Sequence, residues 1–153
     1  KLKYDGRAGG GQRGYTAFGV ENAKGKAEAD LKEFWHTGRD LPADSPYRKT
    51  MADTPSVTEV PEFDAATRGM FDALDTFGRQ LLRAVALHLK LEETWFDNKV
   101  EMGNSILRML HYPPVPAGAS GVRAGAHEDI NVITLLLGAE EGRRLREACC
   151  GYC

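Results

Sequence analysis

The strongest candidate for chemistry is a histidine and an aspartate separated by one residue, His127 and Asp129. In an extended segment, residues i and i+2 project to the same face, so the imidazole and the carboxylate can approach one ion while Glu128 points away. Such a pair is two-thirds of the facial triad that holds Fe(II) through two histidines and one carboxylate. Taken alone the spacing is weak, because a surface strand end explains it equally well.

Other candidate sites carry less weight. Residues 9–14 match G-x-G-x-x-G literally, but no strand precedes them and no helix follows, so we expect a loop without a dinucleotide. His36 has no candidate partner near it in the sequence. His88 lies beside the apolar stripe of a predicted helix, where most histidines are packed or half-exposed. His111 and Tyr112 are neighbours in a predicted strand, so only one of them can face a pocket.

Three cysteines lie within the last five residues, at Cys149, Cys150 and Cys153. As thiolates they can bind a soft metal only where a scaffold orders them, so we expect a frayed tail instead. Their clustering leaves no pair to cross-link distant parts of the chain, which argues against a secreted disulfide scaffold.

The composition is that of a globular protein, with 153 residues, 42% hydrophobic and 27% charged. Twenty basic and 22 acidic residues give a net charge of -2 without a basic stripe, so neither nucleic acid nor membrane is an expected partner. No apolar run reaches the length of a membrane span, and no signal-peptide core follows the N-terminus. We therefore expect a cytoplasmic protein with a small-molecule partner.

One long helix is the clearest predicted element. Apolar side chains recur every three or four residues between positions 63 and 89, which places them in one stripe, and Pro61 suits the helix start. A shorter helix is predicted for residues 92–101. Strands are predicted for four segments: 15–20, 30–36, 105–112 and 130–137. The last strand is β-branched and leucine-rich, as if buried on both sides, and the whole pattern favours the α+β class.

Three stretches of the chain carry a joint signature. Residues 127–136, HEDINVITLL, combine H-x-D with an I-T-x-L run, and residues 108–114, RMLHYPP, end in Tyr-Pro. Residues 13–21, RGYTAFGVE, and 30–34, DLKEF, are similar to an N-terminal R-G-Y and D-x-K-E-x-F pattern. In order and spacing, from about residue 4 to Gly142, they resemble the isopenicillin N synthase-like family of Fe(II) and 2-oxoglutarate-dependent oxygenases.

The resemblance implies a double-stranded β-helix, or jelly roll, with helices packed outside it. It implies that His127 and Asp129 hold Fe(II), and that Tyr112 reaches a carboxylate of the cosubstrate or substrate. In such enzymes 2-oxoglutarate and O2 drive the oxidation of a small molecule, although isopenicillin N synthase itself uses no 2-oxoglutarate. The chain then divides into a loop-rich region 1–60, helices and first jelly-roll strands 61–142, and an aberrant or disordered tail 143–153.

The chain also departs from the family pattern. After Asp129 there is neither a histidine nor an Arg-x-Ser pair, so the second histidine ligand and the 2-oxoglutarate anchor have no counterpart. Residues 143–150, RRLREACC, replace the family's strand pattern, as a shifted reading frame or truncated gene model would. We expect either an oxygenase that is incomplete in this chain or an inactive scaffold that binds a partner. An unpaired edge of the 130–137 strand would favour self-association, and a site completed by His111 or a tail cysteine is a minor alternative.

Overall fold

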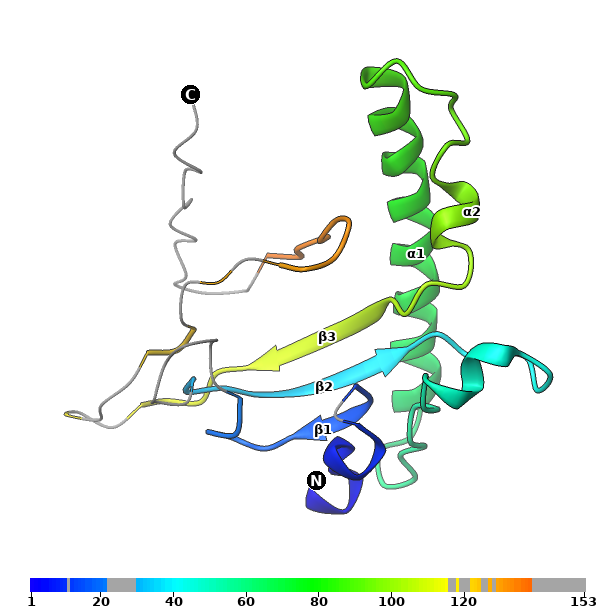
Figure 1. Cartoon of the computed structure of the whole chain (residues 1–153). Helices are drawn as coiled ribbons and strands as arrows, with labels where there is room; N and C mark the ends of the chain where they lie inside the picture. Colours follow the sequence, from blue (N-terminus) through cyan, green and yellow to red (C-terminus); the bar gives the residue numbers. More distant parts are fainter. Residues whose placement is uncertain are drawn as a thin grey trace.

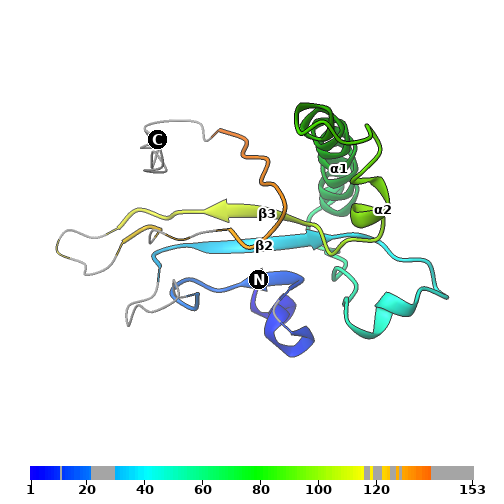
Figure 2. The ribbon, with the colours of Figure 1, turned by 45° about the horizontal axis from the view of Figure 1, so that its top comes forward.

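A computed structural model describes residues 1–10, 12–21, 30–115, 118, 122–124, 127 and 129–138. In this part of the chain a three-stranded antiparallel sheet, in the order β1-β2-β3, lies beside a long helix (Figure 1, Figure 2). The strands are β1 (Gly14–Thr16), β2 (Glu33–Gly38) and β3 (Ile106–His111). The helices are α1 (Phe63–His88) and α2 (Asp97–Val100), with 3-10 turns η1 (Leu2–Tyr4), η2 (Gly6–Gly9) and η3 (Pro46–Lys49). The α+β class is confirmed at this level.

The register of β2 and β3 divides the sheet into two faces. Phe34 lies opposite Leu110 and His36 lies opposite Arg108. Because directly opposed residues of antiparallel strands share a face, these four side chains lie together on what we call the Phe34 face. Alternation along β2 places Trp35 on the other side, which we call the Trp35 face.

The Trp35 face is covered by the start of α1 and by η1. The Trp35 ring meets Phe63 of α1 at 5.3 Å between ring centroids and Tyr4 of η1 at 5.7 Å, both edge to face. Aromatic pairs favour this geometry because the positive ring edge meets the negative ring face. These contacts fix the start of α1 and the N-terminal turn η1 to this side of the sheet.

Helix α1 confirms the longest predicted element. One side of it is buried, through the residues Thr67, Phe71, Gly78, Leu82 and Ala86. The helix begins after Glu62, whose φ is 66°, and Asp64 in the first turn accepts a hydrogen bond from the Val57 amide at 3.0 Å. A carboxylate is favourable there because the helix dipole is positive at its N-terminus. Lys90, with φ 60°, turns the chain away after the helix ends.

Part of the apolar stripe of α1 is exposed in the described chain. The exposed members are Met70, Phe77, Leu81 and Val85. Helix α1 runs across the strand direction, and its C-terminal half extends beyond the sheet (Figure 1). In the part of the chain that the structure describes, no helix combines the length and apolar character needed to cross a membrane.

The short helix and the first strands differ in length from their predictions. Helix α2 spans only 97–100 of the predicted 92–101, because the Trp95 amide bonds to the Glu92 carbonyl in a three-residue turn. Strand β2 starts at Glu33 and not at Asp30, because the Lys32 amide bonds to the Asp30 carbonyl at 2.9 Å and forms a turn there. Local hydrogen bonds thus replace helix or ladder bonds at both places.

The glycine-rich segment forms no dinucleotide loop in the described residues. The turn η2 is followed by Gly10, which is in the left-handed region with φ 85°, and β1 begins at Gly14. Gly11 lies outside the described residues. A strand instead of a helix follows, so the helix N-terminus that would hold a pyrophosphate is missing from this segment.

The strand predicted for 130–137 is wrong in this structure. A strand requires a hydrogen-bonding neighbour, and no described strand pairs with this segment. Ile133 and Leu135 are half-buried, and their methyl carbons would lie 3.8 and 3.5 Å from a Cβ placed on Gly78 of α1. Val132 and Leu136 are exposed, and Figure 1 shows the segment as a loop that doubles back beside α1. The predicted burial of this segment on both sides is therefore not observed for Val132 and Leu136.

Glu33 gives the sheet a testable pH dependence. The Glu33 carboxylate accepts hydrogen bonds from Lys1 at 2.5 Å and from Tyr15, and it pairs with His111 at 2.8 Å. These contacts lower the pKa of Glu33 from 4.5 to about 2. Because the folded chain favours the carboxylate, this stabilisation is present above pH 4.5 and is lost as pH falls toward 2. Burial, followed by the hydrogen bond to Glu33, raises the pKa of Tyr15 to about 12.

We therefore expect Glu33→Gln to lower the free energy of unfolding near neutral pH. The difference from the unmodified chain should shrink as pH falls through the window from 4.5 to 2. Urea unfolding followed by circular dichroism at several pH values measures it, with Glu92→Gln at an exposed position as control. A difference that persists unchanged at the acid end would contradict the assignment.

Candidate metal and cosubstrate site

His127 and Asp129 lie close together, as their spacing predicts. The His127 Nε2 and Asp129 Oδ1 atoms are 3.6 Å apart, and the two side chains are 54% and 51% exposed. Two donors about 2.1 Å from one ion lie about 3.0 Å apart at a right angle and about 4.2 Å apart in line. The observed separation falls between these limits, so one ion can take both donors. An imidazole with a carboxylate is also a donor set that suits Fe(II).

The Asp129 carboxylate is held by Thr134, which the sequence alone does not identify as a site residue. The Thr134 hydroxyl donates a hydrogen bond to Asp129 Oδ2, which leaves Oδ1 directed at His127. Asn131 in turn donates from its amide to the Ile133 carbonyl at 2.7 Å and to Thr134 Oγ1 at 3.0 Å. Partners of this kind orient ligands and tune their affinity. The I-T-x-L run contains this residue: its threonine is Thr134, whose hydroxyl bonds to the Asp129 carboxylate.

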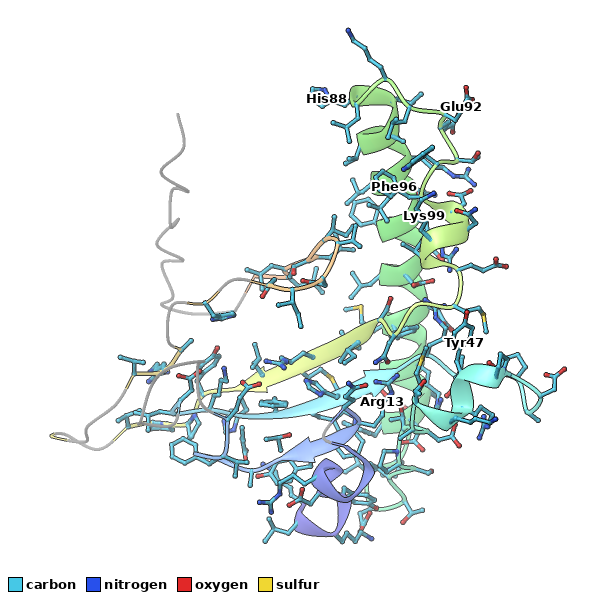
Figure 3. All side chains as sticks on the ribbon, viewed as in Figure 1. Arg13, Tyr47, His88, Glu92, Phe96 and Lys99 are labelled. Carbon is cyan, nitrogen blue, oxygen red and sulfur yellow. The ribbon has the colours of Figure 1, made fainter. Side chains whose placement is uncertain are left out.

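The described residues supply two donors to this site and no more. No group of three or more His, Cys, Asp or Glu side chains that could hold a metal occurs among them. His111 pairs with Glu33 on the Trp35 face, and His88 lies at the C-terminal end of α1 (Figure 3). The tail cysteines, together with the predicted tail 143–153, lie outside the described residues.

Tyr112 directly follows β3 and is half-buried. Continuing the alternation of Arg108 and Leu110 by one more step places residue 112 on the Phe34 face, and His111 on the opposite one. The pairing of His111 with Glu33 agrees with that division. Of the two neighbours, Tyr112 is therefore the one on the side that α1 and η1 do not cover.

His36 does have a partner, contrary to what its sequence surroundings suggested. It is buried on the Phe34 face, where Arg108 Nε donates to His36 Nε2 at 2.8 Å. Since a guanidinium can only donate, Nε2 must carry a lone pair and the ring is neutral, with its proton on Nδ1. The Arg108 guanidinium also lies 4.5 Å from the centre of the Phe34 ring.

A chain of charges continues from Arg108. Glu21 pairs with Arg108 at 3.2 Å and with the buried Lys32 at 2.7 Å, and Lys32 pairs with the buried Asp30 at 2.8 Å. Burial raises the pKa of Glu21, but hydrogen bonds and charges from Lys32 and Arg108 outweigh burial and hold it below its usual value. Burial lowers the pKa of Lys32, but its contacts with Asp30 and Glu21 outweigh burial and raise it, so Glu21 and Lys32 each favour the charged form of the other.

Arg13 is a further cation near the sheet, in addition to Arg108 and Lys32. It is 3% exposed and donates to the Asn104 side chain at 2.6 Å and to the Gln12 carbonyl at 2.7 Å. A Cβ added to Gly38 would overlap Arg13 Nε, so the guanidinium fills the space of a side chain at position 38. Among the described residues Nε has no acceptor. Figure 3 shows Arg13 near the end of the sheet closest to α1.

Comparison with known proteins defines the class. No protein-family model matches the chain. A 2-oxoglutarate-Fe(II) type oxidoreductase from Aspergillus fumigatus is 35% identical over 134 residues, which cover 82% of this chain and 40% of that protein. The crystal structure of a 2OG-Fe(II) oxygenase family protein from Caulobacter crescentus superposes with a TM-score of 0.78 and 51% identity, over 93% of this chain and 47% of the other.

A third relative carries the cosubstrate in its crystal structure. This full-length protein from Neurospora crassa, in complex with alpha-KG, matches with a TM-score of 0.60 and 27% identity, over 82% of this chain and 42% of its own. The chain belongs to the 2-oxoglutarate–Fe(II) oxygenases. It spans about 40% of the length of the curated relatives that it matches over most of its own length.

Proposed function

We propose that the whole protein is a non-haem Fe(II) oxygenase that uses 2-oxoglutarate and O2 to oxidise a small molecule. In this proposal His127 and Asp129 are iron ligands, Tyr112 contacts a carboxylate of cosubstrate or substrate, and the three-stranded sheet is part of a jelly roll. The single observation that carries it is the His127–Asp129 pair, with donors 3.6 Å apart and the carboxylate fixed by Thr134. The relatives support the same assignment through their names and their bound alpha-KG.

The residues of this chain contribute to positioning. When bound, Fe(II) with 2-oxoglutarate supplies the oxidising chemistry, as in the family. Thr134 keeps one carboxylate oxygen of Asp129 occupied so that the other is presented beside the imidazole. Two protein donors hold Fe(II) more loosely than the three of a facial triad, so we expect weak metal binding by this chain alone.

The test is an anaerobic titration of the purified chain with Fe(II) in the presence of 2-oxoglutarate. A 2-oxo acid that chelates Fe(II) produces a metal-to-ligand charge-transfer absorption in the visible range, and we expect that band to grow with 2-oxoglutarate and to be absent with succinate. Circular dichroism confirms that the chain is folded. If the folded chain shows no band at saturating Fe(II) and 2-oxoglutarate, the proposed oxygenase function fails for this chain.

A binding role without catalysis is the second candidate, favoured by one observation. Ile130, Val132, Leu136 and Leu137 are exposed, next to the exposed stripe of α1. Exposed apolar surface of this kind is typical of an interaction site or of self-association. We expect sedimentation velocity to show concentration-dependent association that Val132→Asp reduces. Val60→Asp, at another exposed valine, is the matched control, and equal behaviour of the two variants would contradict this role.

A further inference from the structure

The Phe34 face has a defined order of side chains along the strands. It begins at Tyr112, continues with Leu110 opposite Phe34, then Arg108 opposite His36, and ends at Gly38. Residues two apart in a strand are about 7 Å apart, so Arg108 lies about 13 Å along the strand from Tyr112. Tyr112 and Arg108 therefore stand apart on the same face, with the apolar Leu110 between them, and Lys32 precedes β2 at the Tyr112 end.

Arg108 is held on three sides and shares its carboxylate partner with Lys32. The Arg108 Nε–H donates to His36 Nε2 at 2.8 Å, and the guanidinium lies over the Phe34 ring. The distances from Arg108 to Glu21 are 3.2 and 3.3 Å, longer than the 2.7–2.9 Å usual for charged pairs, whereas Lys32 binds Glu21 at 2.7 Å. The side chain remains 39% exposed. Both terminal nitrogens of Arg108 face the two oxygens of Glu21, so a substrate carboxylate would have to take the place of Glu21, which keeps its contact with Lys32.

A second guanidinium adds positive charge at the same end. No ion pair of Arg13 within salt-bridge distance occurs among the described residues, although Asp40 and Asp53, which pair with Arg68 and Arg48, act on it from further away. The buried Arg13 Nε has no acceptor in the same part of the chain. Arg108 and Lys32 form ion pairs with Glu21 and Asp30, whereas Arg13 lies within the electrostatic influence of Asp40 and Asp53.

We propose that the Phe34 face lines the substrate site and that Arg108, positioned by His36, binds a carboxylate at the end of the substrate remote from Tyr112. The substrate is then a small carboxylic acid with an apolar part that lies over Leu110. Arginine suits this role because its planar fork matches a carboxylate with two parallel hydrogen bonds. The inference rests on the proposed function, since Tyr112 marks the cosubstrate end of the face.

The test uses hexanoate and its neutral isostere hexanamide as probes of the full chain. Binding is followed by NMR, through the chemical shifts of the arginine Nε–H groups. We expect hexanoate to bind more tightly than hexanamide and to shift Arg108. Arg108→Gln should weaken hexanoate at least about tenfold, because a hydrogen bond between charged groups is lost, and Arg108→Lys should weaken it less.

Arg83→Gln is the matched control. Arg83 is 45% exposed and pairs with Asp97 at 2.7 Å, so it resembles Arg108 in exposure and pairing but lies on α1. We expect it to leave hexanoate binding unchanged. Equal effects of the two glutamine variants, or an affinity for hexanamide equal to that for hexanoate, would overturn the inference. The lysine variant keeps the test valid if Arg108→Gln fails to fold.

Manganese separates this inference from the proposed function. With Mn(II) bound at His127 and Asp129, we expect stronger broadening of the hexanoate methyl protons than of the protons next to its carboxylate. The reverse order would place the carboxylate on the metal and overturn the inference while leaving the proposed function intact. If Mn(II) broadens neither end but Arg108→Gln still weakens hexanoate, the carboxylate site stands and the proposed metal site fails.

Discussion

Replacement of Gly38 by alanine should destabilise the chain strongly. The new Cβ would overlap the Nε, Cζ and one terminal nitrogen of Arg13. Arg13 is buried, so it cannot move into solvent without breaking its hydrogen bonds to Asn104 and Gln12. Overpacking in a filled interior costs about 1–3 kcal/mol, and the lost hydrogen bonds add to it.

Urea unfolding followed by circular dichroism measures this effect. Gly69→Ala in α1 is the control, because nothing lies within 4 Å of a Cβ at that position and alanine favours helix. It should be neutral or stabilising by up to about 1 kcal/mol. In a double-mutant cycle, Arg13→Ala should relieve much of the cost of Gly38→Ala. Costs that simply add would show that Arg13 does not occupy the space above Gly38.

Loss of the Asp129 carboxylate should have the largest effect on metal binding. Asp129→Asn removes the charged donor 3.6 Å from His127 Nε2, and we expect Mn(II) affinity to fall by more than the roughly 10–100-fold typical of a supporting residue. Thr134→Val removes only the hydroxyl that orients Asp129, so it should fall within that roughly 10–100-fold range.

Electron paramagnetic resonance of unbound Mn(II) measures both affinities. Asp72→Asn, at an exposed carboxylate of α1, controls for the loss of one negative charge and should bind Mn(II) like the unmodified chain. A Thr134→Val variant as weak as Asp129→Asn would indicate that the whole turn has collapsed. An Asp129→Asn variant as tight as the control would show that the metal binds elsewhere.

The elements that could be predicted from the sequence are those that local patterns determine. Helix α1 is predictable because its apolar residues repeat at helical spacing along its whole length, and the helix forms one buried side whatever lies opposite. The His127–Asp129 pair follows from the alternation of an extended chain, which needs no tertiary information. The placement of His111 and Tyr112 on opposite faces of the sheet follows from the same alternation of side chains along an extended chain.

The features that sequence reasoning misses depend on residues far apart in the chain. The Arg108–His36 hydrogen bond joins residues 72 positions apart, and only the register of β2 with β3 brings them together. The composition of 130–137 indicates a strand, but pairing is a property of two segments, and the described chain offers this one only the side of α1. The turn at Asp30 likewise depends on buried charges that also involve Glu21.

The most direct test of the metal site is NMR of the four histidine side chains during titration with Mn(II). Paramagnetic broadening depends steeply on distance, so it reports which imidazole approaches the ion. We expect the signals of His127 to broaden first, with His36, His88 and His111 following only at higher Mn(II), and Asp129→Asn to abolish the selectivity. Broadening that begins at another histidine, or that reaches all four together, would contradict the assignment of His127 and Asp129 as the metal ligands.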